Sequence, residues 1–489
     1  MQLIQKRNHK YLIVIFLIYG TIYSSISFVN HYLFRTYSLD LGLYNKVLYD
    51  YATFSTNNYS VLAHRFPHHL ADHFSLLIPL ISPFYWIFKS YTLLVFQIVS
   101  ILFGAYGIYK FLVLKYDNTK IAILAVVHFL SIWGIYSALS FDYHDNVVAA
   151  MFVPWLFWSF EKYKIKYILI FVLLICFAKE NMALWCGFIL LGIGFQHRKE
   201  KAKRNLALQL SFFVLVYFVL VLKVVMPSID YDGKVHQLDR YAALGTSLGE
   251  IFFNLINHPI NSFKLFFDNT ATPQEYYGIK TELHLMVLTA GGIVFLIRPI
   301  WLLMLFPIYA QKMWTNDFGL WGINNQYSIE FVPIICLALF SYIVELKSKI
   351  NKIILTVFFI VITLNSTINT IEERESFWYN PENSMFFDKK HYSANFDVKE
   401  LNTSLELIPT KASVSAQSFV VPHVFERKNV FMFPDKMDEA DYIILVYQNT
   451  KYPLSEEYYN MVVKKLLVDK KHKLMYCKNY TYIFKKINF

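Results

Sequence analysis

The chain has 489 residues, of which 56% are hydrophobic and only 17% charged, and its formal net charge is +11 at pH 7. This composition excludes an ordinary soluble protein, because the apolar residues gather in runs long enough to cross a bilayer. The positive charge does not indicate nucleic-acid binding, since many Lys and Arg residues lie in short segments beside these runs, where they orient a membrane protein. The four cysteines match neither a metal site nor a disulfide framework.

The apolar runs predict a polytopic α-helical membrane protein with about eleven transmembrane helices. The first run follows a basic N-terminus and is expected to be a retained span, because a signal peptide has a shorter apolar core. The segment 74–88 carries two prolines, so we expect it to be interfacial or re-entrant, with a full span as the alternative. The predicted spans are 11–34, 91–113, 120–139, 146–161, 167–178, 182–196, 205–226, 284–297, 299–313, 328–346 and 352–370.

The basic residues orient these spans. If the N-terminus is cytoplasmic and 74–88 does not span, every second loop is rich in Lys and Arg, as cytoplasmic loops are. These loops lie at 110–120, 162–166, 198–204, 298 and 347–352. We therefore expect a multi-pass protein of the cytoplasmic (inner) membrane, with its polar motifs on the extracytoplasmic face.

Two domains are expected. Residues 1–370 would form the transmembrane domain, with long outer loops at 35–90 and 227–283. Residues 371–489 would form a small extracytoplasmic α/β domain, because turn signals there separate short β-like runs. The expected strands are 412–421, 441–447 and 474–485, and the expected helix is 455–468.

Asp40 is the first candidate for chemistry, in the sequence SLDLGLYN just beyond the first span. A lone carboxylate among apolar residues at a membrane interface is costly to hold there. It could act as a general base that takes a proton from an acceptor hydroxyl. The alternative is an N-cap for an interfacial helix that starts at Leu41.

A histidine-rich segment follows between positions 64 and 73, with Arg65 and Asp72 inside it. Four histidines could bind a metal, and on a helix His69 and His73 would share one face. No known zinc pattern is complete, and a polar interfacial helix explains the same residues. Arg65 would suit a lipid phosphate.

Three further groups lie on the same expected face. Asp142, His144 and Asp145 could coordinate a cation or, through one, a pyrophosphate-type leaving group; a solvated turn is the alternative. The pair Lys179 and Glu180 interrupts two apolar runs, either as a helix junction or to place Lys179 against a lipid phosphate. Arg240 and Tyr327 are also candidates, although such residues are ordinary interfacial anchors. All of these residues are read from the sequence.

The motifs together resemble DUF2079, a bacterial membrane-protein family of uncharacterised function that is similar to the GT-C superfamily of polyprenyl-phosphate-sugar-dependent glycosyltransferases. The resemblance covers nearly the whole chain. The motifs that carry it are, in order, LDLGLYN, DHFSLLIPLISPFY, FDYHDN, FAKEN, QYSIEFVPII, IPTKASVSAQSFVVPH and ADYIILVY.

The resemblance implies a role for several residues. Asp40 matches the essential acid that GT-C enzymes carry in the first outer loop. Asp142 and Asp145 match a second acidic motif, with His144 at a family histidine position. His73, Lys179 and Glu180 match the family's histidine and Lys-Glu pair. Two departures stand out: no second acid accompanies Asp40, which puts metal dependence in doubt, and Asp145 and Asn146 follow His144 where proline and an acid are frequent.

The leading hypothesis is a GT-C-type inverting glycosyltransferase at the outer face of the membrane, using a polyprenyl-phosphate-linked sugar. Asp40 would be the base, and Lys179 and Arg240 would neutralise the lipid phosphate. His73, His144 and Asp145 would shape the donor pocket, and the last two would be ligands if a divalent cation is needed. Two alternatives stay open. A lipid or polysaccharide transporter would carry charges deep within its spans, and a non-catalytic scaffold would hold Asp40 and His144 far apart.

Overall fold

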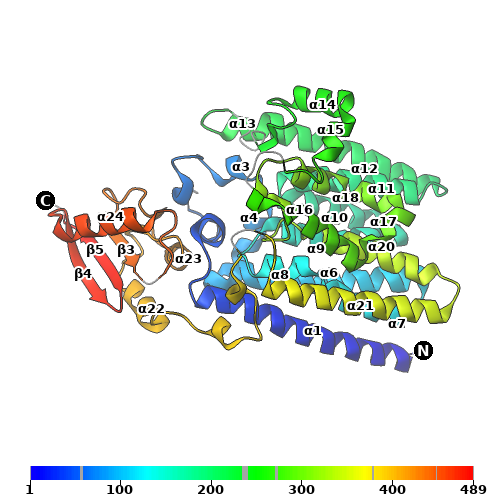
Figure 1. Cartoon of the computed structure of the whole chain (residues 1–489), viewed down its shortest axis with the longest axis horizontal. Helices are drawn as coiled ribbons and strands as arrows, with labels where there is room; N and C mark the ends of the chain where they lie inside the picture. The colour runs from blue at the N-terminus through cyan, green and yellow to red at the C-terminus, as the bar shows by residue number, and fades with distance from the viewer. Residues whose placement is uncertain are drawn as a thin grey trace.

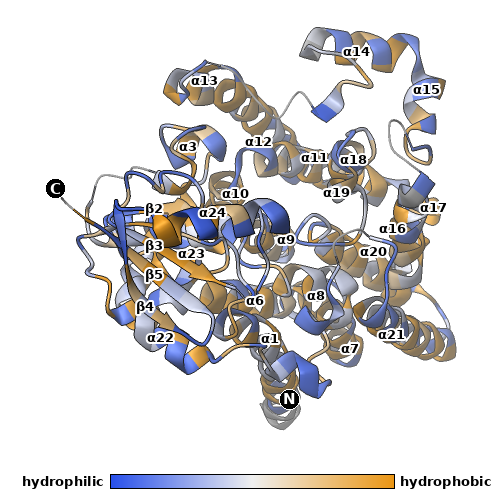
Figure 2. Cartoon of the chain, turned by 60° about the vertical axis from the view of Figure 1, so that its left-hand side comes forward, coloured by the Kyte–Doolittle hydropathy of each residue, from blue (hydrophilic) through white to orange (hydrophobic). Residues whose placement is uncertain are grey.

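The computed structural model describes residues 2–55, 59–233, 240–269, 274–376, 379–447 and 449–487. Figure 1 shows a bundle of long helices with a small sheet domain beyond one end, while the N-terminus lies at the opposite end. In Figure 2 the bundle helices are largely hydrophobic in colour, and the sheet domain carries more hydrophilic segments.

The apolar runs that predict spans form helices in the bundle, although the 284–297 run is interrupted at Gly291, whose φ is 104°. The long apolar runs favour helices because a helix satisfies its own backbone hydrogen bonds where water is absent. The helices are α1 (Gln2–Tyr32), α6 (Thr92–Tyr116), α7 (Thr119–Ser131), α8 (Trp133–Leu139), α9 (Asp145–Lys162), α10 (Ile165–Ala178), α11 (Glu180–Gln196), α12 (Lys201–Leu220), α16 (Ile279–Val287), α17 (Val294–Ile297), α18 (Pro299–Met313), α20 (Phe331–Glu345) and α21 (Lys349–Glu372).

The count of eleven spans is not confirmed. By length and composition, four segments of the described chain can cross a membrane, or five if the bent pair of α7 and α8 is one span. Helices α10 and α20 are apolar but have 14 and 15 residues. At 1.5 Å per residue they reach about 21–23 Å, less than the ~30 Å of a hydrocarbon core. The four segments are His9–Tyr32, Leu77–Tyr116, Lys201–Ile229 and Lys349–Glu372.

Two of these segments present apolar side chains to the surroundings. Leu17 of α1 is 66% exposed, and Phe212 of α12 is 64% exposed. Faces of this kind suit contact with lipid, because a soluble surface rarely exposes so much contiguous apolar area.

Short helical elements cover the end of the bundle near the sheet domain. The segment 74–88 forms helical turns of at most five residues, and the backbone departs from helical geometry at Lys89, with φ 51° and ψ −129°. The elements before α6 are η1 (Ser38–Gly42), α2 (Leu43–Ala52), η2 (Ser60–Leu62), α3 (His69–Asp72), α4 (Leu77–Ile81), η3 (Ser82–Phe84), α5 (Tyr85–Phe88) and η4 (Lys89–Tyr91). Those of the long outer loop and of the stretch before α20 are α13 (Met226–Ile229), α14 (Leu248–Asn257), α15 (Pro259–Lys264), η7 (Gln274–Tyr276) and α19 (Phe318–Trp321).

The C-terminal domain holds a five-stranded sheet in the order β2-β1-β3-β5-β4. Strand β1 is parallel to β2 and β3, while β5 is antiparallel to β3 and β4. Every residue of β3 is buried, as expected for an apolar central strand. The strands are β1 (Ser413–Ala416), β2 (Asn429–Met432), β3 (Tyr442–Val446), β4 (His472–Lys478) and β5 (Thr481–Lys486), and the helices are α22 (Val398–Glu406), α23 (Val421–Val424) and α24 (Glu456–Val468).

This domain packs directly on the loop that follows α1. The Arg35 guanidinium donates to the carbonyls of His391 at 2.9 Å and Ser393 at 2.7 Å. Ser38 and Ser418 share a hydrogen bond of 2.9 Å between their hydroxyls. The sheet domain therefore braces the segment that carries Asp40.

Candidate functional site

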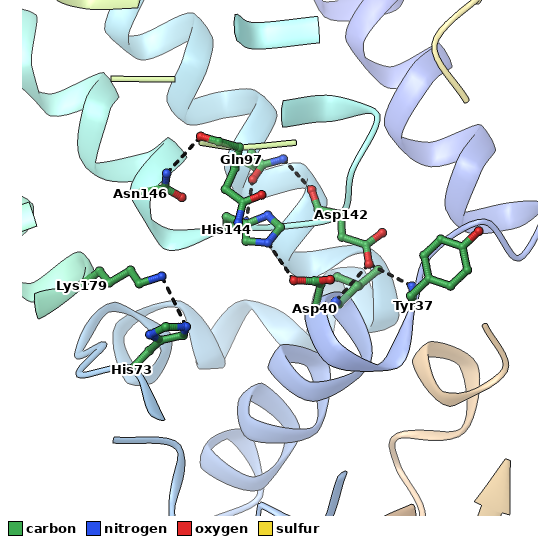
Figure 3. Close-up of polar contacts among 10 residues, drawn as sticks. Tyr37, Asp40, His73, Gln97, Asp142, His144, Asn146 and Lys179 are labelled. Atoms are coloured by element: carbon green, nitrogen blue, oxygen red, sulfur yellow. Dashed lines mark hydrogen bonds and ion pairs between the residues drawn. The ribbon is translucent and has the colours of Figure 1, made fainter. Parts of the chain in front are cut away.

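Asp40 lies in the π-helical turn η1 at the end of the bundle nearest the sheet domain. It does not cap a helix: neither η1 nor α2 has a side-chain cap, so the N-cap alternative is wrong. The Asp142 carboxylate holds this turn, because its Oδ2 accepts the backbone N–H groups of Tyr37 at 2.9 Å and Leu41 at 3.2 Å. Asp142 thus fixes the backbone of the turn that carries Asp40 (Figure 3).

His144 connects to Asp40 directly. Its Nε2 lies 2.9 Å from Asp40 Oδ1, and its ring stacks on Phe141 with centroids 5.5 Å apart. Burial lowers the pKa of His144, which the Asp40 carboxylate opposes. In the hydrogen bond between them, the Nε2–H of the ring donates and the Asp40 carboxylate oxygen accepts.

Gln97 of α6 makes two hydrogen bonds to the loop that carries Asp142 and His144. Its Nε2 donates to the carbonyl of Asp142 at 2.9 Å, and its Oε1 accepts the backbone N–H of His144 at 3.0 Å. The burial of Asp142 raises the pKa of that carboxyl, the nearby Asp40 charge raises it further, and the two backbone donors oppose both effects. Desolvation and a like charge act together here.

His73, Lys179 and Glu180 form the second part of the site. His73 Nε2 lies 3.3 Å from Lys179 Nζ, and its Nδ1 lies 3.5 Å from Glu180 Oε1. Glu180 Oε2 also accepts the backbone N–H of Phe74 at 3.0 Å. The expectation that His69 and His73 share a helix face is wrong, because α3 ends at Asp72 and His73 is extended, with φ −135° and ψ 122°.

The two parts lie within electrostatic reach of each other. Both Lys179 and His73 lower the pKa of His144, after the larger effect of its burial. Asp145 is buried beside them, and its Oδ1 accepts the Tyr143 hydroxyl at 2.7 Å. Figure 3 shows Asp40 and Lys179 on either side of His144. The structure therefore brings seven of the expected site residues together: Asp40, His73, Asp142, His144, Asp145, Lys179 and Glu180.

Exposure separates the residues that can meet a ligand from those that support them. The Asp40 side chain is 24% exposed and the His73 side chain 29%, whereas those of His144 and Glu180 are 5% and 8% exposed. Lys179 is half-buried. Hence one carboxylate, one imidazole and one ammonium can be reached from outside.

Three candidate residues remain, Tyr327, Arg240 and Arg65. Burial raises the pKa of Tyr327 to about 12, with a smaller contribution from Asp40, so Tyr327 is near the acid. Arg240 is exposed, and its Nε lies 3.9 Å from Asp317 Oδ2. Arg65 is exposed and lies over the Phe66 ring at 5.2 Å. Among the described residues, the contact of the Arg65 guanidinium is thus with Phe66 and not with the Asp40 site.

Sequence reasoning missed two supporting residues. Gln97 lies inside an apolar run, and Glu330 lies just before α20. Glu330 Oε1 accepts the Asn146 side chain at 2.8 Å, and Asn146 also donates to the Gln326 carbonyl at 3.1 Å. A polar residue in an apolar membrane segment is a functional signal in itself, and Gln97 carries that signal.

The proposed metal ligands do not converge. His144 turns to Asp40 and Asp145 turns to Tyr143. Among the residues that the structure describes, no three His, Cys, Asp or Glu side chains form a group that could hold a metal. The geometry around Asp145 and His144 thus gives no support to a cation at this pair.

Residues 30–465 match the model of a family described as predicted membrane protein (DUF2079). The chain belongs to the DUF2079 family. The matched range runs from the end of α1 into α24, so it includes the whole Asp40 site and most of the sheet domain. No curated protein matches the chain. Membership in DUF2079 and the apolar helices agree on a membrane location.

Proposed function

We propose that the protein is a membrane glycosyltransferase that moves a sugar from a polyprenyl-phosphate-linked donor to an acceptor hydroxyl at the outer face of the cytoplasmic membrane. The observation that carries the proposal is the pairing of an accessible, oriented carboxylate with an accessible ammonium. Asp40 is held by the His144 ring at 2.9 Å, and Lys179 lies on the other side of that ring (Figure 3).

Asp40 and Lys179 each have one role in the proposed transfer. An Asp40 carboxylate oxygen takes the proton of the acceptor hydroxyl as its oxygen attacks the anomeric carbon. The bond between that carbon and the phosphate oxygen breaks, and the lipid phosphate leaves with the electron pair. Attack from the opposite face inverts the anomeric centre. Lys179 stabilises the phosphate charge that develops, which in a poorly hydrated site is worth more than in water.

His144 and Asp142 are positioning residues in this proposal. The His144 ring is hydrogen bonded to Asp40 and holds the carboxylate in one orientation. Asp142 fixes the backbone of η1 through two N–H groups. Such support matters because a misplacement of about 1 Å can cost ~100-fold in rate.

The two alternatives receive less support. The scaffold hypothesis expects Asp40 and His144 far apart, yet their side chains are hydrogen bonded. The transporter hypothesis expects ionisable groups in the middle of spans. The charges described above gather instead at helix ends, as with Asp145 and Glu180 at the first residues of α9 and α11.

Donor turnover by the purified full chain in nanodiscs tests the proposal. A panel of polyprenyl-phosphate-linked sugars is the probe, and released polyprenyl phosphate is the readout. We expect Asp40→Asn to lower turnover about a thousandfold or more, since a general base supplies ~10²–10⁴. The matched control is Asp232→Asn, which changes an exposed acid outside the site. Full activity of Asp40→Asn, or no turnover of any donor by the wild type, would contradict the proposal.

A further inference from the structure

A cavity of about 690 Å³ lies at the end of the bundle opposite the Asp40 site. Its walls come from the ends of α6, α11, α17 and α20 and from the start of α18. Along α6, the distance from Gln97 at the Asp40 site to Lys115 at this cavity is roughly 27 Å. The two sites are thus separated by about the thickness of a hydrocarbon core.

The carboxylates around this cavity are already neutralised. Glu345 accepts from Arg298 at 2.6 Å, and Glu161 pairs with Lys115. Glu200 lies 2.7 Å from His197 Nδ1 and 2.8 Å from Lys203. Each acid therefore has a basic partner.

Two cations on the cavity wall have no such partner. Arg198 and Lys199 line the cavity and are exposed, and neither forms an ion pair within the described part of the chain. The start of α18 opens to the same space, and no side chain caps that helix. Pro299 has no N–H group and the Trp301 N–H donates to the Arg298 carbonyl at 3.1 Å, so this helix start adds little to the attraction of the two cations for an anion. Among the residues that the structure describes, the cavity wall therefore has a surplus of positive charge.

The rim of the cavity is apolar. Phe195 and Ile297 line it and are 54% and 56% exposed, and Ile300 and Trp301 add further apolar surface. Free inorganic phosphate would gain nothing from these side chains. An amphiphile would place its charged head on the cations and its acyl chains along the apolar rim, as lipids do at such junctions.

We propose that this cavity binds the phosphate headgroup of an anionic phospholipid from the leaflet opposite the Asp40 site. Arg198 and Lys199 bind the phosphate, and Phe195 and Ile297 contact the acyl chains. The pairs Arg298–Glu345 and Lys115–Glu161 hold the helix ends that shape the cavity. The proposal does not depend on the glycosyltransferase activity.

Lipid binding to the purified full chain in detergent tests this site. Native mass spectrometry would measure binding of phosphatidylglycerol, phosphatidylcholine and inorganic phosphate separately. The double variant Arg198→Gln/Lys199→Gln should bind phosphatidylglycerol roughly thirtyfold more weakly, because each basic residue near an anionic lipid surface contributes ~1 kcal/mol. The matched control is Lys347→Gln/Lys349→Gln, which removes the same charge from exposed positions that do not line the cavity.

Three outcomes would overturn the proposal. An equal loss in the Lys347→Gln/Lys349→Gln control would mean that only the general positive charge of this end matters. Equal binding of phosphatidylcholine would remove the need for an anionic headgroup. Competition by inorganic phosphate at the same concentration as the lipid would identify a site for the free anion instead. An unchanged melting temperature in both double variants shows that folding is intact, as expected for exposed side chains.

Discussion

The two ends of the helix bundle handle charge in different ways. At the Asp40 end, the supporting ionisable groups are buried and fixed by hydrogen bonds, as Asp142 is by two backbone N–H groups. At the Arg198 end, the charges are mostly exposed ion pairs, and two cations are left over. Burying ionisable groups costs desolvation free energy, but hydrogen bonds then hold these groups in a fixed geometry. Exposed cations attract anions, and dissolved salt weakens this attraction by screening. The first arrangement suits chemistry and the second suits recognition.

Removal of the Lys179 charge is the sharpest test of the Asp40 end after Asp40 itself. We expect Lys179→Gln to lower kcat for donor turnover by about 10²–10³, because it removes charge stabilisation of the leaving phosphate. Lys179→Arg keeps the charge and should restore part of the rate. An unchanged rate in Lys179→Gln would show that this ammonium does not face the leaving group.

Loss of the His144 ring should have the next largest effect. His144→Ala removes the donor to Asp40 Oδ1, and we expect kcat to fall about a hundredfold with little change in KM. His144→Gln keeps a side-chain N–H and should recover part of kcat. The pH profile of kcat/KM separates positioning from structure, because it changes only when the hydrogen-bonding environment of the catalytic base changes. If Ala and Gln lose the same activity and share the wild-type profile, His144 does not orient Asp40.

Asp142 links stability to pH at this end. Burial and the Asp40 charge raise the pKa of Asp142 in the folded protein. A raised folded pKa gives stability at pH below the unfolded value of about 4, and that stability is lost as pH rises through the folded pKa. Asp142→Asn keeps an oxygen for both N–H groups but has no charge to bury. We therefore expect its melting temperature to exceed that of the wild type by a margin that grows with pH.

The matched variant Asp142→Ala removes the acceptor as well. It leaves the N–H groups of Tyr37 and Leu41 without their partner, which costs about 1–3 kcal/mol for each buried group. Thermal unfolding in detergent at acidic and at alkaline pH measures both variants. A wild type that gains stability over Asp142→Asn as the pH rises would contradict the assigned pKa shift.

The helices could be predicted from the sequence because apolar runs determine them locally. The predicted 120–139 run is α7 and α8, broken at Ile132, whose φ and ψ of −70° and 130° interrupt the helix. The number of spans could not be read in the same way, because an apolar run such as that of α20 can form a short helix that packs inside the bundle. In the sheet domain, the 474–485 run proved to be the hairpin of β4 and β5, and the four-residue β2 was too short to give a signal.

The site could be predicted as a set of residues but not as a geometry. Asp40, Asp142 and His144 stood out because charged groups beside apolar runs are expensive. Their contacts depend on the turn η1, which the sequence pattern 38–42 did not indicate, and on Gln97 from a distant helix. The histidine-rich segment was wrongly expected to form a helix through His73. Tertiary contacts with Glu180 and Lys179 hold His73 in an extended conformation instead.

A single-turnover experiment tests the central claim, that Asp40 is the base of a glycosyl transfer, most directly. Wild type and Asp40→Asn would each be loaded with the same polyprenyl-phosphate-linked sugar in nanodiscs, and both donor affinity and the rate of phosphate release would be measured. We expect the variant to bind the donor within about twofold of wild type but to release phosphate about a thousandfold more slowly. Release at the wild-type rate from the Asp40→Asn complex would contradict the assignment of Asp40 as the base.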